Sequence, residues 1–180
     1  MNTAEKTLLL KKLANEDDSE LASTLHYFRE NGDIELLPNV LELLSSNRSQ
    51  DIKDNVLQLC ADIKNPEAAD MAFAFMMATQ NAEVKKSVIT ALWQTGNNFS
   101  HKAGEIVDII IDSPDFETAF EALTLLENCA VEIEKEPAGN LHNKVAQAAE
   151  NASETKAGIL KAAQTHLLEL SLGRKIERGF

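Results

Sequence analysis

The sequence predicts an all-α protein, an α-solenoid of about five antiparallel helix pairs with ten helices in all. Apolar residues recur along the chain at intervals of 31, 32 and 32 residues, at Leu21, Ile52, Val84 and Phe116. A fixed period of this size is typical of stacked helical units. The 180 residues include only 7 glycines and 4 prolines, so long helices with few turns between them are expected.

Each starting residue of the period is followed by two more apolar residues, four and seven positions later. Positions at this spacing lie on one face of a helix. They are Leu25, Val56, Val88 and Phe120, and then Phe28, Leu59, Ala91 and Leu123. We expect this face to be buried in every unit.

The pattern places the ten helices in chain order, at 3–14, 18–31, 33–46, 50–64, 66–79, 82–95, 100–112, 114–129, 139–152 and 154–172. Asp18 or Ser19 would cap the second helix, because these side chains accept hydrogen bonds from the first free N–H groups of a helix. Gly32 would end it with a positive φ. Asp33 would cap the third helix.

Later boundaries follow from the same kinds of signal. Asn65 and Pro66 would stop the fourth helix, and Ser100 would cap the seventh. Pro114 would stand in the first turn of the eighth helix, where its missing N–H costs nothing.

The segment 131–139 interrupts the period, because it carries three glutamates followed by Pro137 and Gly139. We expect a longer loop there, followed by an atypical terminal pair, since the end units of an array must cover its core with a more polar face. The sequence thus predicts one solenoid domain over 1–172 and a short C-terminal tail over 173–180.

The central units resemble HEAT repeats and their armadillo-like relatives. The segment 83–92, ending at Gly96, resembles the second helix of such a repeat, and Asp51-Ile52-Lys53 and Asp115-Phe116-Glu117 occupy the same place in neighbouring units. Pro38 lies where the family often has a proline. The resemblance implies a right-handed solenoid that serves as a scaffold or protein-binding module and carries no active site. It also implies ion-pair ladders between units through Lys53 and Lys85.

In such arrays the second helices line a concave face, and the sequence offers candidate binding residues there. Trp93 lies about 140° from the buried stripe centred on Val88, so it points away from the core of its own pair. Trp93 and Tyr27 are the candidate anchors. The other candidates are Asp54, Gln58, Lys86, Thr90 and Thr118. The alternatives are that Trp93 fills a gap between second helices and that the rest form an ordinary solvated face.

A second candidate surface is acidic. No Lys or Arg occurs from Ala103 to Glu134, whereas nine acidic residues do. Such a stretch could steer a basic protein or peptide by long-range attraction, or it could simply promote solubility. The candidate patch comprises Glu105, Asp108, Asp112, Asp115, Glu117 and Glu121.

Composition argues against several function classes. The net charge of −12 repels phosphate backbones, so nucleic acid is not an expected partner. No apolar stretch approaches the length of a membrane span, and the Leu8–Leu10 run is too short for a secretory signal. The two cysteines, Cys60 and Cys129, are expected to be buried apolar side chains of a cytoplasmic protein. No catalytic, cofactor or metal-binding pattern is found, so no cofactor is expected.

The leading hypothesis is a non-catalytic scaffold or adaptor, acidic and cytoplasmic, that binds another protein or peptide in a preformed groove. A helical-repeat enzyme or a nucleic-acid-processing module is an alternative, which the negative charge disfavours. A subunit of a homo-oligomer, joined through an apolar end repeat, is another. The sequence leaves the oligomeric state open.

Overall fold

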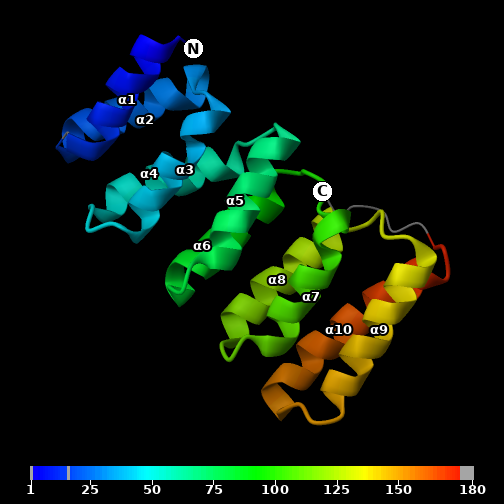
Figure 1. Ribbon diagram of the computed structural model, residues 1–180. Coiled ribbons are helices and arrows are strands. Elements are labelled where there is room, and N and C mark those ends of the chain that lie inside the picture. Colours follow the sequence, from blue (N-terminus) through cyan, green and yellow to red (C-terminus); the bar gives the residue numbers. More distant parts are fainter. Residues whose placement is uncertain (1, 16, 175–180) are drawn as a thin grey trace. The chain divides into compact units, whose positions relative to one another are not determined.

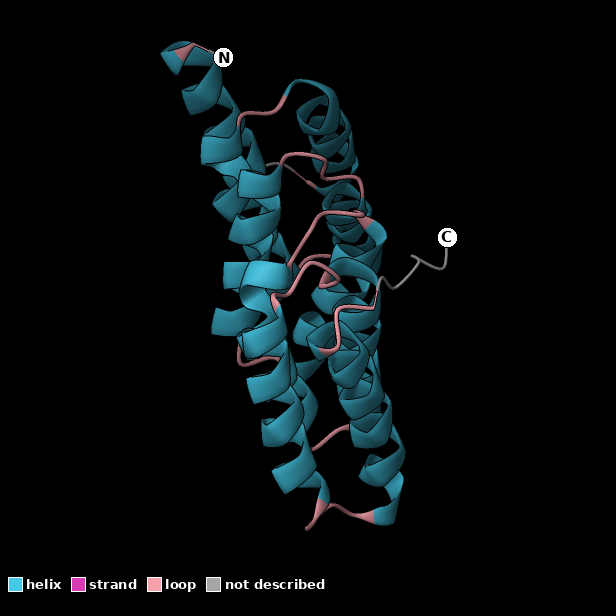
Figure 2. Cartoon of the chain, turned by 90° about the vertical axis from the view of Figure 1, so that its right-hand side faces the viewer, coloured by secondary structure: helices cyan, strands magenta, loops and turns pink. Residues whose placement is uncertain are grey.

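The computed structural model describes residues 2–15 and 17–174, which form helices joined by loops, with no strand among them (Figures 1 and 2). The α-helices are α1 (Thr3–Asn15), α2 (Asp18–Asn31), α3 (Leu37–Glu42), α4 (Gln50–Ala61), α5 (Pro66–Ala78), α6 (Ala82–Gln94), α7 (Ala103–Asp112), α8 (Phe116–Cys129), α9 (Lys135–Ala149) and α10 (Glu154–Ser171). Three short 3-10 helices accompany them: η1 (Ile34–Leu36), η2 (Leu43–Ser45) and η3 (Ser100–Lys102). The prediction of an all-α protein is confirmed.

Most expected helix boundaries fall within a few residues of the observed ones, and the exceptions have local causes. The third expected helix is divided into η1, α3 and η2. The ninth begins at Lys135, so the loop predicted over 131–139 is shorter than expected. Pro137 does not prevent this, because it stands in the first turn of α9, where N–H groups have no partner within the helix.

Helix caps are also displaced in places. Asp17, not Asp18 or Ser19, caps α2 by accepting a hydrogen bond from the backbone N–H of Glu20 at 3.0 Å. Asp33 does cap its helix, as predicted, at the start of η1.

Ser100 and Pro114 do not have the predicted roles. Ser100 is the first residue of η3 and Phe99 is its N-cap, while the side chain of Asn98 accepts a hydrogen bond from the Ser100 N–H at 2.9 Å. Pro114 lies before α8, whose first residue is Phe116 and whose cap is Asp115.

Gly32 ends α2 for a different reason from the one expected. Its φ is −65°, in the ordinary region, so no positive φ is needed. A Cβ at this position would lie 2.3 Å from the carbonyl oxygen of Phe28. Only glycine permits that approach, whereas Gly96 is the glycine after α6 that does take a positive φ, of 70°.

The helices form two compact units, Met1–Thr95 and Gly96–Phe180. In the first unit, α2 packs against α4 and α4 against α6, while α3 packs against α5 and α5 against α6. Helix α1 packs against α2 and α3. The largest fully buried side chains of this unit are Leu21, Leu41, Ile52, Phe73, Met76, Ile89 and Leu92.

The second unit is built in the same manner. Helix α7 packs against α8 and α9, and α10 packs against α7, α8 and α9. Its largest fully buried side chains are Phe99, Ile106, Ile110, Leu125 and Leu126. Gly173 ends α10 with a φ of 73°, and residues 175–180 of the predicted tail lie outside the described part of the chain.

Polar links between neighbouring helices differ from the predicted ladders. Asp18 at the start of α2 binds Arg48 at 3.2 Å and the Ser49 N–H at 3.0 Å, just before α4 begins. The Lys64 ammonium donates to the carbonyl oxygen of Thr95 at the end of α6, at 3.0 Å. Arg48 and Lys64, rather than the expected Lys53 and Lys85, therefore provide these cationic links.

Candidate binding surfaces

Two second helices of the predicted repeats, α4 and α6, enclose an open hollow of about 290 Å³, which we call the α4–α6 hollow. Each helix contributes four residues to its lining: Asp54, Leu57, Gln58 and Ala61 from α4, and Ser87, Thr90, Ala91 and Gln94 from α6. The two helices pack side by side, and the small side chains of Ala61, Ser87 and Ala91 leave space between them. Helix packing with small contact residues thus creates the cavity.

The α4–α6 hollow presents hydrogen-bonding groups over an apolar floor. Ala61 and Ala91 are buried beneath it. The Asp54 carboxylate accepts from the Gln50 amide at 2.8 Å, which holds it in place. The Thr90 hydroxyl donates to the Lys86 carbonyl at 3.1 Å, and its oxygen can still accept a hydrogen bond from a ligand.

Three of the seven candidate binding residues predicted from sequence, Asp54, Gln58 and Thr90, come together in the α4–α6 hollow. Trp93 and Lys86 lie on α6 but outside its lining. Trp93 is half-buried and stands 32 residues after Ala61, so it lies on the flank of α6 that corresponds to the Ala61 side of α4. Lys86 pairs with Glu83 at 3.2 Å.

Thr118 does not belong to an exposed surface. It is only 4% exposed, and its hydroxyl donates to the Asp115 carboxylate at 2.7 Å. The sequence placed Thr118 among the candidate binding residues of the concave face, but its side chain is instead buried and bonded to Asp115, the N-terminal cap of α8.

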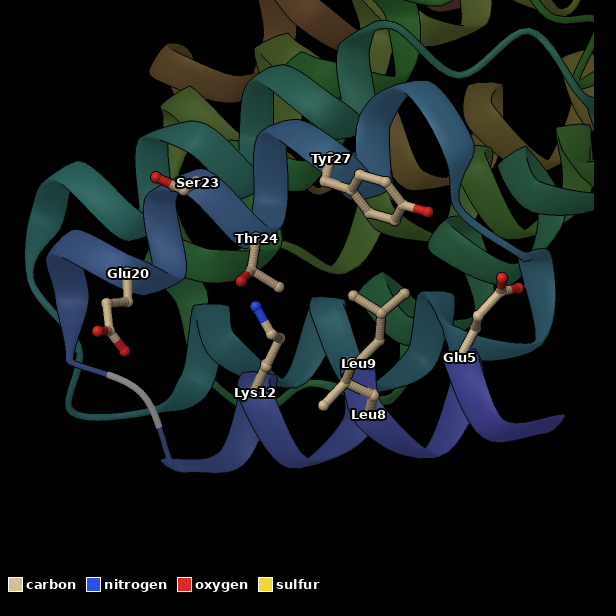
Figure 3. Close-up of a pocket in the computed structure, with 8 residues that line it drawn as sticks. All are labelled: Glu5, Leu8, Leu9, Lys12, Glu20, Ser23, Thr24 and Tyr27. Carbon is tan, nitrogen blue, oxygen red and sulfur yellow. The ribbon is translucent and has the colours of Figure 1, made fainter. Parts of the chain in front are cut away.

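Tyr27 is exposed, but it lines a different cavity, the α1–α2 hollow (Figure 3). This cavity has a volume of about 520 Å³. Its lining consists of Glu5, Leu8, Leu9 and Lys12 from α1 and Glu20, Ser23, Thr24 and Tyr27 from α2. Leu9 and Thr24 are buried at its base, whereas Leu8 and Tyr27 are 56% and 47% exposed.

Sequence reasoning missed the α1–α2 hollow, because it treated the Leu8–Leu10 run only as a test for a secretory signal. A signal was present. Glu5, Leu8, Leu9 and Lys12 have the i, i+3, i+4, i+7 spacing of one helical face.

The predicted acidic patch falls into two groups. Glu105, Asp108 and Asp112 share one face of α7, since they are three and four residues apart. Asp108 forms an ion pair with Lys144 of α9, and Glu105 lies 3.7 Å from the ammonium of Lys102. These cations come from outside the acidic stretch and partly neutralise it.

The second group, Asp115, Glu117 and Glu121, lies at the start of α8. Asp115 is the cap of that helix and accepts from the Thr118 N–H at 2.8 Å. Glu117 stands in the first turn, where a negative charge is stabilised by the helix dipole. Asp115 thus has a structural role that the sequence count could not distinguish from a surface for a basic partner.

The cysteines and histidines offer no reactive cluster. Burial raises the pKa of the Cys60 thiol to about 12, which keeps it protonated and unreactive. In residues 2–15 and 17–174, no three His, Cys, Asp or Glu side chains lie close enough together to hold a metal ion. None of the helices in that part of the chain is long and apolar enough to cross a membrane.

Comparison of the chain with protein-family models, with curated proteins and with solved structures gave no match. The resemblance to HEAT repeats therefore stays a prediction.

Proposed function

We propose that this protein is a HEAT-like α-solenoid that acts as a non-catalytic adaptor, and that it binds a segment of another protein in the α4–α6 hollow. One observation carries the proposal. Asp54, Gln58 and Thr90, chosen from sequence as binding residues of successive second helices, line one cavity. We further propose a reducing cytoplasm as its location, since both Cys60 and Cys129 are buried as free thiols.

The repeat architecture is supported by the sequence separation of the polar links. Asp18 and Ser49 are 31 residues apart, as are Lys64 and Thr95, and within the second unit Ser100 and Glu132 are 32 apart. A contact that recurs at the period of the sequence joins equivalent places in successive units, as expected of a stacked array.

A protein segment suits the chemistry of the α4–α6 hollow better than other ligand classes. Apolar floor atoms beside an amide, a hydroxyl and a carboxylate match the mixed polarity of a peptide. A phosphate would instead meet Asp54 in a chain with a net charge of −12. Because the hollow lies between packed helices, little ordering is needed on binding, and this favours affinity.

The test is site-directed photo-crosslinking in the native cell. A photoreactive amino acid placed at Gln58 or Thr90 should capture a defined partner. The same amino acid at Glu67, which is exposed on α5 away from the hollow, should not. Purified partner should then bind the Thr90→Arg variant at least about tenfold more weakly than the wild type, because the larger side chain fills the cavity.

Trp93 provides the binding signal for that titration, since it is the only tryptophan and lies three residues from Thr90 on α6. Glu67→Arg is the matched control and should retain wild-type affinity. Equal capture from Gln58 and Glu67, or equal affinity of the two arginine variants, would refute the assignment of the binding site.

A further inference from the structure

The eight residues that line the α1–α2 hollow form a self-complementary set. Along the sequence of α1, Glu5 and Lys12 lie equally many residues from the midpoint of the four lining residues, with Leu8 and Leu9 between them. On α2, the outer pair is Glu20 and Tyr27, and the inner pair is Ser23 and Thr24. Each of the four outer residues thus has a counterpart of complementary chemistry at the mirrored sequence position of its own helix.

Figure 3 shows how these positions lie across the cavity. Lys12 and Glu20 are toward one end, Glu5 and Tyr27 toward the other, and the two leucines lie between. A two-fold axis across the middle of this face would exchange its ends. Glu5 would then face Lys12 of a second copy, and Glu20 would face the second copy's Tyr27 hydroxyl.

From this symmetry we infer that the α1–α2 hollow is the interface of a two-fold dimer of this chain. An isologous interface uses the same patch on both subunits and therefore requires such self-complementarity. Two ion pairs would form between Glu5 and Lys12, and the exposed Leu8 side chains of the two copies would lie near the centre of the interface. No pair of like charges faces itself across this arrangement.

Exposed apolar side chains in the hollow provide a favourable free energy for association. Leu8 and Tyr27 are about half exposed above the buried Leu9 and Thr24. Burying exposed apolar area is the main favourable term in protein association. Glu5 can take part without losing its local role, because one of its carboxylate oxygens accepts from the Asn2 N–H at 2.9 Å and the other remains for Lys12 of the second copy.

The decisive experiment reverses the charge of Glu5 or of Lys12. The Glu5→Lys variant carries lysine at both rim positions, and Lys12→Glu carries glutamate at both, so each should repel itself. Sedimentation equilibrium over about 1 μM to 1 mM should show a dimer for the wild type. We expect a dissociation constant at least about tenfold higher for either variant alone, because like charges then face each other twice.

Mixing the two variants restores both opposite-charge pairs and should return the dissociation constant to within about threefold of the wild type. The double variant Glu5→Lys/Lys12→Glu should dimerise in the same way. Glu67→Lys is the control, since Glu67 is also an exposed glutamate in the first turn of a helix. Circular dichroism melts of all variants establish that each is folded. Recovery of dimerisation in the mixture then reports only on pairing between folded copies.

A site-specific readout is available, because Tyr27 is the only tyrosine. Protein labelled with 3-fluorotyrosine should give one ¹⁹F resonance, which should shift with protein concentration in the wild type and with mixing of the two charge variants. A wild type that stays monomeric up to about 1 mM, or a mixture that dimerises no better than its components, would overturn the inference. A resonance that moves only when a different protein is added would assign the hollow to that protein and would equally overturn it.

Discussion

For Phe99 and Phe116, the repeat pattern and the structure disagree about which side chain belongs to the core of the second unit. Replacing each residue with alanine would decide between the two descriptions. The 32-residue period puts Phe116 on the buried stripe and gives Phe99 no role. In the structure, Phe99 is 0% exposed although it stands between α6 and η3, whereas Phe116 is 49% exposed. The two residues are identical in type, so each is the control for the other.

The expected magnitudes follow from burial. A phenylalanine buries about 150–250 Å², which at roughly 25 cal/mol per Å² amounts to about 4–6 kcal/mol, and measured Phe→Ala losses in cores are about 3–5 kcal/mol. We expect Phe99→Ala to lower the free energy of unfolding by about 4 kcal/mol. Its backbone N–H, which donates to the Cys129 carbonyl at 2.6 Å, is unchanged by the substitution. Phe116→Ala should cost about 2–3 kcal/mol, because half of its surface is buried, in part by stacking on Phe120.

Urea unfolding followed by far-UV circular dichroism measures both losses. If Phe99→Ala leaves too little folded protein, Phe99→Leu should still fold and lose about 1 kcal/mol. Equal losses for the two alanine variants, or a larger loss at Phe116, would show that the period and not the structure describes this core.

Three further outcomes are expected. Gly32→Ala should destabilise the protein, because its Cβ would meet the Phe28 carbonyl oxygen at 2.3 Å. Gly104→Ala in α7 has open space around the new Cβ and should stabilise the protein by about 0.5–1 kcal/mol. Thermal melts of the two variants test both expectations. Burial lowers the pKa of His166, so the unfolded chain binds a proton before the folded chain does, and the free energy of unfolding should fall as pH drops below 6.5. A His166→Phe variant should lose that part of the pH dependence. The Cys60 thiol, with its pKa raised to about 12, should react with a disulfide reagent only after denaturant is added.

Local signals in the sequence were sufficient to place the helices. Asp33 caps the helix that follows it, as predicted, because a short polar side chain reaches the N–H two residues on, and this needs no tertiary information. Asn65, which was expected to stop the fourth helix, caps α5 in the same way. Gly32 shows the limit of such rules. Glycine after a helix usually signals a positive φ, but here it reflects the close approach of the Phe28 carbonyl, which depends on the path of the chain after α2.

The sequence predicted neighbouring site residues correctly only on helices that follow the repeat period. Asp54, Gln58 and Thr90 gather because α4 and α6 are one repeat apart and pack side by side, so their helical positions carry over into space. Tyr27 did not join them, since α1 and α2 enclose a cavity of their own. The negative charge of the acidic stretch was overestimated for a related reason. Lys144 lies 36 residues from Asp108, so counting charges along the sequence does not reveal that the two side chains pair.

The period does not predict burial correctly in α8. The sequence marks one face of this helix as apolar, but burial depends on whether another element covers that face. Val56 and Val88 are fully buried, but Phe120 at the equivalent position is 49% exposed. Phe116 and Phe120 shield each other instead, with ring centroids 6.2 Å apart and planes 14° from parallel. A repeat pattern fixes the direction in which a side chain points, whereas burial also requires a neighbour of matching shape. Leu123, the third residue of the pattern in α8, is buried as predicted, whereas Phe99 enters the core of the second unit from a connecting segment that carries no repeat signal. The pattern therefore predicted the helices of this unit and only part of its core.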